Sequence, residues 1–372
     1  MKVLILHASA GAGHQRAAEA IAEAIRARHP GVEPVVRDVL EFTSRVFRTG
    51  YAKGYLNLVR RAPELWGYLY ANADRHSQTP LRRRMRAAFN KLNTRSFEGF
   101  FRELGPDAVV CTHFMPLQIV AAMIAEGRTA VPLHCVVTDF AVHSLWLERH
   151  ASAYHVATHE AQRFLVRQGC ASDSVHVSGI PVAPAFAGPD RGDTVKRELG
   201  LDLSLPTALL LSGGFGVGPT VELVRSFAGS PARMQLLVVA GRNPRLQARL
   251  QEAAAALSHP VRVFGFVDTI EQLMDAADFV ITKPGGLTTS EALARGRPLI
   301  LIDPIPGQEQ RNSDYLLEQG AAVRLHEPAD APEKLRRLVE DPPRVERLRA
   351  NARRISRPEA AFAIAERVVC RP

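Results

Sequence analysis

The stretch Ile281–Asn312, ITKPGGLTTSEALARGRPLILIDPIPGQEQRN, determines the fold that we expect for this chain. An apolar strand ending at Thr282 meets the turn Pro284-Gly285-Gly286, good helix formers run from Thr288 to Arg295, and a second apolar strand follows. Backbone amides left free at such a turn, together with the positive end of the helix dipole, suit a phosphate group. The stretch therefore predicts a strand, a turn, a helix and a second strand, with an anion site at the turn.

Polar residues around this unit predict a ligand that is rich in hydroxyl groups. Glu291 lies one helical turn past the glycines, and Gly307-Gln308-Glu309 with Asn312 clusters amide and carboxylate groups after the second strand. Any strand–turn–helix unit uses glycine in its turn, so this turn alone would not indicate a ligand. Two more glycine turns, Ser212–Gly218 and Gly241-Arg242-Asn243, follow the apolar strands TALLL and QLLVVA. Three such turns mark the carboxyl edge of a parallel sheet, where open α/β sheets bind ligands.

Motifs along nearly the whole chain carry a family resemblance. They are ASAGAGHQRAAEAI at Ala8–Ile21, VVTDFAVHSLW at Val136–Trp146, VSGIPVAPAF at Val177–Phe186, SGGFG at Ser212–Gly216, GFVDTIEQLMDAADFVITKPGG at Gly265–Gly286, and the stretch Glu291–Asn312. The chain resembles the monogalactosyldiacylglycerol synthase and processive diacylglycerol glucosyltransferase family, relatives of the lipid-II-forming N-acetylglucosaminyltransferase. This resemblance implies an α/β protein of the GT-B fold, with two Rossmann-like domains whose parallel sheets face an interdomain cleft.

Length and pattern agree with two domains. A chain of 372 residues is long for one ordinary α/β domain. Strands alternate with helices in the first half, the segment Ile180–Asp193 is rich in Pro, Gly and Ala, and a new alternation starts at Thr207. We expect an N-terminal acceptor- and membrane-facing domain at 1–185, a nucleotide-sugar-binding domain at 186–356, and a terminal helix at 357–372 that crosses back to the first domain.

Composition argues for a cytoplasmic protein. The longest apolar runs, such as Leu117–Ala125, are far shorter than a bilayer span, and the N-terminal MKVLILHASAGAG is typical of a first strand rather than of a signal peptide. The four cysteines are widely spaced, without a C-x-x-C motif or a histidine at zinc-finger spacing. We therefore expect neither a disulfide framework nor a metal site, and a location in the cytoplasm, peripheral on the inner face of the cell membrane.

The positive charge is concentrated in one segment. Arg45–Arg102 carries 13 basic and 3 acidic residues, so it accounts for the whole formal net charge of +9, and it holds 10 of the 24 aromatic residues. Arginine mixed with Trp and Tyr suits the boundary between anionic lipid head groups and acyl chains. The residues that we expect at this acceptor and membrane surface are Trp66, Arg82, Arg83 and Arg84.

Two other interpretations of the same segment stay open. Basic residues interleaved with aromatic residues also bind single-stranded nucleic acid, but no helix-turn-helix, RRM or KH signature accompanies them, so we expect no nucleic acid partner. Alternatively, some of the aromatic residues pack in helices of the N-terminal domain, and Leu81–Leu92 forms a solvated amphipathic helix. The lipid surface is favoured because the acceptor that the resemblance implies is a membrane lipid.

The loop Ser9–His14 brings backbone close to the predicted cleft, because Gly11 and Gly13 carry no side chain. It is not a dinucleotide fingerprint, since Arg16 stands where the third glycine would be required. His14 begins a helix, where the dipole disfavours a protonated imidazole, so a neutral ring able to accept a proton is expected. His14 is therefore a candidate catalytic base.

Asp139 is the second candidate base. It follows the apolar strand that ends in Val136-Val137-Thr138, and a carboxylate at that position lies at the ligand-binding edge of the sheet. It would remove the proton of the acceptor hydroxyl or orient His14, although Asp after a strand is also a common turn residue. His143 and Trp146 would shape the acceptor entrance. In the resembling family both motifs are associated with the acceptor and catalysis, which places His14 slightly ahead.

The predicted donor site meets the needs of glycosyl transfer. Amides of the 213–216 and 285–289 turns would stabilise a leaving diphosphate, with charge added by Arg242 or Lys283. No D-x-D motif is present, and the resemblance likewise implies a metal-independent, inverting reaction without a cofactor. The resemblance also implies that Phe264–Val267 line the nucleotide base, that Glu291 holds the ribose, and that Gln308 and Glu309 hold the sugar. The predicted donor-site residues are Gly213, Gly214, Phe215, Gly216, Arg242, Asn243, Phe264, Phe266, Val267, Lys283, Gly285, Gly286, Leu287, Thr288, Thr289, Glu291, Gln308, Glu309 and Asn312.

The resulting hypothesis is an inverting hexosyltransferase that moves a sugar from a UDP-sugar to the hydroxyl of diacylglycerol at an anionic membrane surface. A polyprenyl or small hydrophobic acceptor is the alternative within this class. A UDP-sugar epimerase is the alternative from another class, although an epimerase needs no lipid-binding segment. Galactose, glucose and N-acetylglucosamine stay equally open as the donor sugar, because they differ by one hydroxyl orientation or one substituent.

Overall fold

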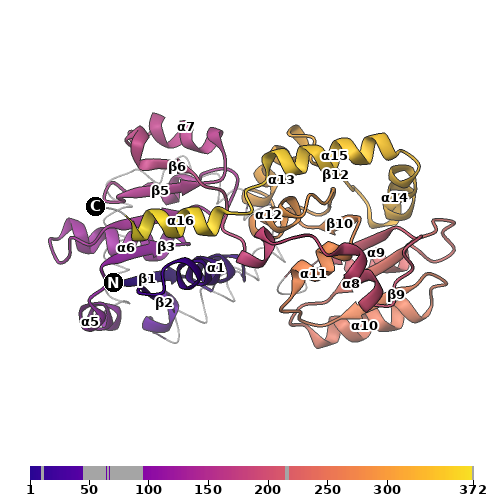
Figure 1. The fold of residues 1–372 in the computed structure, drawn as a ribbon, viewed down its shortest axis with the longest axis horizontal. Coiled ribbons are helices and arrows are strands. Elements are labelled where there is room, and N and C mark those ends of the chain that lie inside the picture. The colour runs from indigo at the N-terminus through magenta and orange to yellow at the C-terminus, as the bar shows by residue number, and fades with distance from the viewer. Residues whose placement is uncertain (10–11, 45–63, 65–66, 68–94, 214–217, 371–372) are drawn as a thin grey trace. The chain divides into compact units, whose positions relative to one another are not determined.

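The computed structural model describes residues 1–9, 12–44, 64, 67, 95–213 and 218–370, which form two compact units (Figure 1). The first unit contains Met1–Pro184, Ile305–Gln308 and Pro358–Pro372, and the second contains Ala185–Pro304 and Glu309–Arg357. Each unit is built on one six-stranded parallel sheet. The α/β class and the pair of Rossmann-like folds that the sequence predicts are confirmed.

The sheet of the first unit has the strand order β2-β1-β3-β4-β5-β6. Its strands are β1 (Lys2–His7), β2 (Glu33–Asp38), β3 (Ala108–Cys111), β4 (Leu133–Val136), β5 (Ala153–Val156) and β6 (Val175–Val177). Its helices are α1 (Ala12–Arg28), α5 (Arg95–Leu104), α6 (Phe114–Ala125), α7 (His159–Arg167) and α16 (Ala360–Val369), with the 3₁₀ turns η1 (Val39–Phe42), η2 (Ser144–Trp146) and η3 (Ser172–Ser174). Because β1 pairs with both β2 and β3, the chain winds outward in two directions from β1.

Alternation along the strands gives the first unit two cores. On β1, Leu4 and Leu6 belong to the core that contains residues of α5, α6 and α7, whereas Val3 and Ile5 belong to the core that contains residues of α1 and α16. Successive side chains of a strand point to opposite faces, so an all-apolar strand such as VLIL is buried on both. Helices therefore cover both faces of this sheet.

Helix α16 packs against α1 within the first unit (Figure 1). Its apolar side belongs to the same buried cluster as Ile21 and Ile25 of α1. That side consists of Ala361, Ile364, Ala365 and Val368, each at most 2% exposed. At the edge of this contact, Arg28 pairs with Glu359 at 2.9 Å. Residues from the end of the sequence thus complete the core of the first unit.

Helix α5 shows that part of the aromatic content of Arg45–Arg102 builds the fold. Phe97 and Phe101 are buried in the core of the first unit, as the interpretation of these residues as scaffold predicts. Trp66, Arg82, Arg83 and Arg84 lie outside the described residues. Among the described residues, no helix combines the length and hydropathy needed to cross a bilayer.

The sheet of the second unit has the order β12-β11-β10-β7-β8-β9. Its strands are β7 (Thr207–Leu211), β8 (Gln235–Val239), β9 (Val261–Phe264), β10 (Phe279–Thr282), β11 (Leu299–Leu301) and β12 (Ala322–Arg324). Its helices are α8 (Gly192–Glu198), α9 (Thr220–Arg225), α10 (Pro244–Ala255), α11 (Ile270–Ala276), α12 (Gly286–Ala294), α13 (Gln308–Glu318), α14 (Ala331–Val339) and α15 (Pro342–Ile355), with the 3₁₀ turns η4 (Pro184–Ala187) and η5 (Pro328–Asp330). Here β7 is the strand from which the chain winds in both directions.

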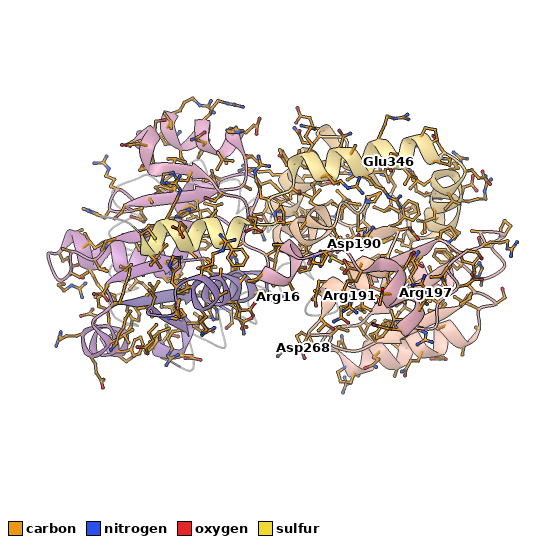
Figure 2. All side chains as sticks on the ribbon, viewed as in Figure 1. Arg16, Asp190, Arg191, Arg197, Asp268 and Glu346 are labelled. Atoms are coloured by element: carbon orange, nitrogen blue, oxygen red, sulfur yellow. The ribbon has the colours of Figure 1, made fainter. Side chains whose placement is uncertain are left out.

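Two buried arginines hold the start of the second unit. The guanidinium of Arg295, just after α12, donates to the carbonyl oxygens of Ala185 (3.0 Å) and Gly188 (2.7 Å) and pairs with Asp275 at 2.9 Å. Arg297 pairs with Asp190, which Figure 2 labels. The proline- and glycine-rich segment that the sequence suggests as a linker is therefore fixed by ionic contacts to the end of α12.

We expect Arg295→Met to destabilise the second unit by about 3 kcal/mol or more, because it leaves the buried carboxylate of Asp275 without its ion-pair partner. Urea unfolding, monitored by hydrogen exchange of the α12 amides, would measure the loss in free energy of unfolding. Arg191→Met is the matched control, since Arg191 and its partner Glu198 are both about half exposed, and its effect should stay within about 0.5 kcal/mol. Equal effects of the two changes would contradict the role given to Arg295.

Candidate active site

Strand order defines one ligand-binding edge in the first unit. The chain winds away from β1 in opposite directions, so the loops that follow β1 and β3 diverge and leave a crevice at the carboxyl ends of these strands. The loop after β1 leads to His14 in the first turn of α1, and the residue after β3 is Thr112. Thr138 lies two residues past the end of β4, at the same edge. The strand order therefore brings together residues that are about a hundred positions apart in the sequence.

The contacts of His14 fix its tautomer. Its Nδ1 lies 2.7 Å from the carbonyl oxygen of Thr112 and 3.0 Å from Oγ1 of Thr138. A carbonyl oxygen only accepts, so Nδ1 carries the hydrogen and donates it to Thr112. The Thr112 hydroxyl also donates a hydrogen bond to the carbonyl oxygen of His14 at 2.8 Å, so two hydrogen bonds join the two residues. In the neutral ring, Nε2 is then the unprotonated nitrogen, and it can accept a proton.

The surroundings of His14 keep it neutral. Its pKa is lowered to about 4: burial is the main cause, the contact with the Thr112 carbonyl raises the pKa, and the neighbouring His7 lowers it. The His113 ring stands edge-on at 4.6 Å between centroids, and the Trp146 ring lies at 6.4 Å. At neutral pH the imidazole is therefore neutral, without a proton on Nε2; the sequence suggested a neutral ring from the helix dipole, whereas burial is the main cause in the structure.

The other predicted residues of the first unit are mostly buried. Trp146, whose ring lies beside that of His14, is 3% exposed, and His143 is 2% exposed and accepts a hydrogen bond from the Leu145 amide through its Nδ1. Asp139 is half-buried next to Thr138. Gly13 opens α1, and Gly11 lies outside the described residues.

A large cavity lies elsewhere in the first unit. Its volume is about 860 Å³, and its lining includes residues of α6, of the segment 147–152 and of the end of α7. Ser152 directly precedes β5, so this cavity opens at the amino edge of the sheet, away from the carboxyl edge that holds His14. His14, whose tautomer is defined by its contact with Thr112, lies at the carboxyl edge and not at this cavity.

The second unit has its own ligand-binding edge, between β7 and β10. The loop after β7 includes Gly213 and Gly218, both with positive φ (72° and 139°), and the loop after β10 includes Lys283 and Gly285. A Cβ on Gly218 would lie 3.1 Å from Cε of Lys283, which shows how closely the two loops approach. Gly214, Phe215 and Gly216 lie outside the described residues.

Helix α12 points its N-terminus into this edge. Gly285 is the N-cap, with φ −69° and ψ 136°, and a Cβ built on it would meet no atom within 4 Å. The amides of Gly286, Leu287 and Thr288 form the first turn, where a helix provides no acceptors of its own. The prediction was wrong for Thr289, whose amide donates to the carbonyl of Gly285 at 3.1 Å, because the helix starts two residues earlier than its propensities suggest.

Two buried polar residues, Asn312 and Glu291, belong to the helices at the α12 turn. Asn312 of α13 is fully buried, and its Nδ2 donates to the carbonyl oxygen of Pro284 at 3.1 Å. Glu291 lies one turn into α12 and is 2% exposed. Gln308 and Glu309 open α13 and are half-buried. The structure therefore places Asn312 beneath the turn as a support for its backbone, and Gln308 and Glu309 at a helix start with partial access to solvent.

Lys283 and Asp303 form an ion pair at this edge, with Nζ and Oδ2 2.9 Å apart. Lys283 follows β10, and Asp303 comes two residues after β11, the next strand of the sheet. Asp303 has φ 49° and is the one non-glycine with a positive φ among the described residues. Strained backbone of this kind clusters at functional sites. Asp303 was not predicted from the sequence, where an aspartate after an apolar strand reads as an ordinary turn residue.

The remaining predicted donor residues lie at the ends of β8 and β9. The guanidinium carbon of Arg242 lies 4.0 Å from the centroid of the Phe266 ring, and Phe266 is 46% exposed, so an aromatic face is open to a flat ligand. Phe264 and Val267 are half-buried beside it. Asn243 accepts a hydrogen bond from Leu246 and caps α10, which gives it a structural task.

Sequence reasoning missed the two partners of His14. Thr112 acts mainly through its carbonyl oxygen, which every residue possesses, so its side chain gave no signal. Thr138 stands beside the predicted Asp139, and its hydroxyl oxygen lies 3.0 Å from Nδ1 of the His14 ring. A threonine one residue after β3 and another two residues after β4 were the signal available in the sequence.

Comparison with known proteins defines the class. Residues 14–182 match the family model described as monogalactosyldiacylglycerol (MGDG) synthase, and residues 221–355 match glycosyl transferases group 1. The structure of Acinetobacter baumannii MurG aligns with a TM-score of 0.64 at 15% identity, covering 99% of both chains, and UDP-GlcNAc 2-epimerase from Neisseria meningitidis, bound to UDP-GlcNAc, aligns with 0.60 at 15%, covering 98% and 99%. The chain is a glycosyltransferase of the GT-B fold.

Full-length relatives narrow this class. The processive diacylglycerol β-glucosyltransferase of Bacillus cytotoxicus is 29% identical over 367 residues, which cover 98% of this chain and 92% of the relative. The enzyme of the same name from Bacillus pumilus is 26% identical over 371 residues, which cover 99% and 94%. The chain is therefore similar over nearly its whole length to processive diacylglycerol glucosyltransferases, and its first half matches the monogalactosyldiacylglycerol synthase family model.

Proposed function

We propose that this protein transfers a hexose from a UDP-sugar to the hydroxyl of diacylglycerol, with inversion at the anomeric carbon. The contact between His14 Nδ1 and the Thr112 carbonyl carries the proposal, because it leaves a neutral Nε2 available as the general base. That nitrogen takes the proton of the acceptor hydroxyl while the hydroxyl oxygen bonds to the anomeric carbon. The bond from that carbon to the diphosphate breaks, and UDP leaves.

The edge between β7 and β10 supports the donor half of the proposal. The first turn of α12 offers amides and a positive dipole end to the diphosphate, and Lys283 adds a cation. The exposed ring of Phe266 suits a uracil base. Structural relatives bound to UDP-sugars, such as the Neisseria meningitidis epimerase, add support for a uridine nucleotide.

Cations of the protein and the helix dipole stabilise the leaving diphosphate in this proposal, so the reaction needs neither a divalent metal nor a cofactor at the reacting centre. The absence of a D-x-D motif from the sequence is the observation behind this expectation. We also propose that the protein acts as a peripheral protein at the inner face of the cell membrane. Its relatives are named for diacylglycerol, a lipid found in membranes.

The test is a matrix of donors and acceptors. Purified protein is incubated with UDP-glucose, UDP-galactose or UDP-N-acetylglucosamine, with and without diacylglycerol in anionic liposomes, and with EDTA in a parallel series. UDP release and lipid products are followed by mass spectrometry. A glycosylated diacylglycerol that forms only with liposomes, with or without EDTA, supports the proposal. Sugar isomerisation without lipid would instead indicate an epimerase, and a product on a polyprenyl or soluble acceptor would overturn the choice of lipid.

We expect Asp303→Asn to tighten UDP binding about two- to fivefold, because Lys283 no longer has to leave a carboxylate in order to meet the diphosphate. Asparagine tolerates the positive φ at this position, so the backbone is kept. Isothermal titration calorimetry at low and high salt would measure the change, which salt should reduce. Asp314→Asn removes an exposed carboxylate at the surface of the second unit and is the matched control. Weaker UDP binding by Asp303→Asn would show that this carboxylate helps the ligand.

A further inference from the structure

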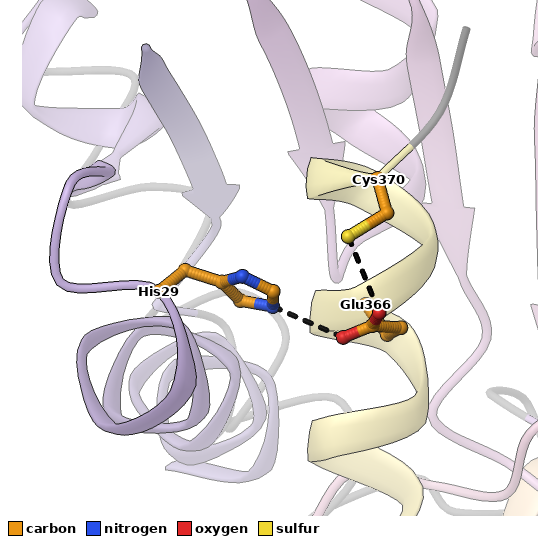
Figure 3. Close-up of side chains that lie close together, drawn as sticks. All are labelled: His29, Glu366 and Cys370. Carbon is orange, nitrogen blue, oxygen red and sulfur yellow. Dashed lines mark hydrogen bonds and ion pairs between the residues drawn. The ribbon is translucent and has the colours of Figure 1, made fainter.

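Three side chains converge where the end of α1 meets α16. His29 follows the last residue of α1, and Glu366 and Cys370 lie four residues apart on one side of α16 (Figure 3). Nε2 of His29 is 3.2 Å from Oε2 of Glu366, and Sγ of Cys370 is 3.2 Å from Oε1 of the same carboxylate. We call these residues the His–Glu–Cys cluster.

The geometry of the cluster is close to that of a metal site. One nitrogen, one oxygen and one sulfur atom all lie within 4.8 Å of one another. Zinc binds such atoms at about 2.0–2.3 Å in tetrahedral geometry, which separates the ligand atoms by roughly 3.5 Å. Rotation of the exposed Glu366 and Cys370 side chains can supply the remaining movement, whereas His29, only 15% exposed, already points toward α16.

The kinds of ligand atom select the metal. A thiolate and an imidazole favour Zn²⁺ over Mg²⁺ or Ca²⁺, which prefer oxygen ligands. Three protein ligands leave the fourth position to water, because Glu366 and Cys370 are open to solvent. We propose that the His–Glu–Cys cluster binds Zn²⁺ and thereby clamps α16 onto α1.

Binding of Zn²⁺ to the His–Glu–Cys cluster releases one proton. In the structure the Cys370 thiol donates to Glu366, and this hydrogen bond is the main cause that raises the pKa of the thiol. When Zn²⁺ binds, the thiol proton passes to solvent, sulfur binds the metal as a thiolate, and neutral His29 offers the lone pair of Nε2. The metal then takes the place of two contacts, the thiol–carboxylate hydrogen bond and the His29–Glu366 contact.

The place of the cluster gives the metal a structural effect. Apolar contacts of α16 with α1 and the pair Arg28–Glu359 already hold the helix, so zinc adds a bond between two segments more than 330 residues apart in sequence. A ligand that binds only the folded state raises stability. With Zn²⁺ at about 100 times its Kd, we expect the melting temperature of the first unit to rise by about 5 °C.

The test uses full-length protein, reduced and stripped of metal, with Co²⁺ as a spectroscopic substitute and Zn²⁺ in competition with a chromophoric chelator. We expect one Co²⁺ per chain, a thiolate-to-cobalt charge-transfer band and visible bands of tetrahedral intensity. Cys370→Ser should remove the charge-transfer band, and Cys370→Ser, His29→Asn and Glu366→Gln should each weaken Zn²⁺ binding at least about tenfold. All three residues lie at or near the surface, and circular dichroism will check that the variants fold.

Two control variants test whether the effects are specific to the His–Glu–Cys cluster. Cys170→Ser removes another partly accessible thiol, and Glu359→Gln removes an α1–α16 ion pair outside the cluster; both should keep the charge-transfer band and the Zn²⁺ affinity. A charge-transfer band that survives Cys370→Ser, or Zn²⁺ binding of equal affinity in that variant, would overturn the proposal. So would a melting temperature that Zn²⁺ leaves unchanged.

Discussion

Replacement of His14 by Asn is expected to lower kcat by about a hundred- to ten-thousandfold, the usual contribution of a positioned general base. The Asn amide nitrogen can still donate to the Thr112 carbonyl in place of Nδ1, so the local fold is preserved, but nothing replaces Nε2. Donor binding should be unchanged, since the turns after β7 and β10 and the start of α12 belong to the second unit. Initial rates with dispersed diacylglycerol, together with UDP titrations, would measure both quantities.

The dependence of the rate on pH gives the same prediction a second readout. The active form of His14 is the neutral ring, and burial lowers its pKa to about 4. Activity should therefore stay level as pH falls from about 7 to about 5, and should decline only as the pH approaches 4. An ordinary histidine would begin to lose activity near pH 6.5. A decline centred near 6.5 would show that the ring is not desolvated in the working enzyme.

Asp139→Asn distinguishes the two candidate bases. The hydrogen bond from His14 Nδ1 to the Thr112 carbonyl sets the tautomer of the ring without a carboxylate, so we expect this variant to keep more activity than His14→Asn. If Asp139→Asn were the more damaging change and His14→Asn the milder one, the carboxylate would be the base, and His14 would only position it.

Gly285→Val is expected to reduce kcat/KM for the UDP-sugar by a hundredfold or more, on the order of the loss caused by removing one oxyanion-hole donor. The backbone of Gly285 has φ −69° and ψ 136°, which valine adopts readily, and no atom lies within 4 Å of the added Cβ. The protein should therefore fold with unchanged stability. The new side chain, however, occupies the space in front of the first-turn amides of α12, which the diphosphate needs.

Gly31→Val is the matched control for this change. Gly31 also has open space around its Cβ and lies in the turn between α1 and β2, away from the donor edge. Thermal melting of both variants and of the parent should coincide, while UDP binding should fall only for Gly285→Val. Unimpaired UDP binding by a well-folded Gly285→Val protein would place the diphosphate elsewhere.

The sequence was sufficient for the fold and for the positions of the glycine turns that follow β7 and β10, because both depend on local patterns. Apolar runs followed by glycine turns determine strands and their carboxyl ends, and parallel pairing then gathers those ends without further information. The start of α12 was misplaced by two residues, since Gly286 and Leu287 entered the helix despite the poor helix propensity of glycine. At a helix N-terminus proposed to bind an anion, exposed backbone amides matter more than the helix propensity of the residues.

Features that depend on contacts distant in sequence were not predictable. The partner of His14 Nδ1 is a backbone carbonyl 98 residues away, and a carbonyl leaves no trace in the sequence. Cys370 appeared isolated by spacing, yet the packing of α16 on α1 brings it near His29 through Glu366. The burial of Trp146 beneath His14 also follows from the placement of the loop after β4, which the sequence of that loop alone does not determine.

The packing of α16 has a consequence for how the chain matures. During synthesis, residues 358–369 leave the ribosome only after the whole of the second unit, yet Ile364 and Val368 fill the core beside β1 and α1. The domain made first therefore stays unfinished, with an apolar face of α1 open to water, while the domain made second can already fold. The order of completion is the reverse of the order of translation, so His14 in α1, the proposed base, gains its finished scaffold only after the second unit has been synthesised.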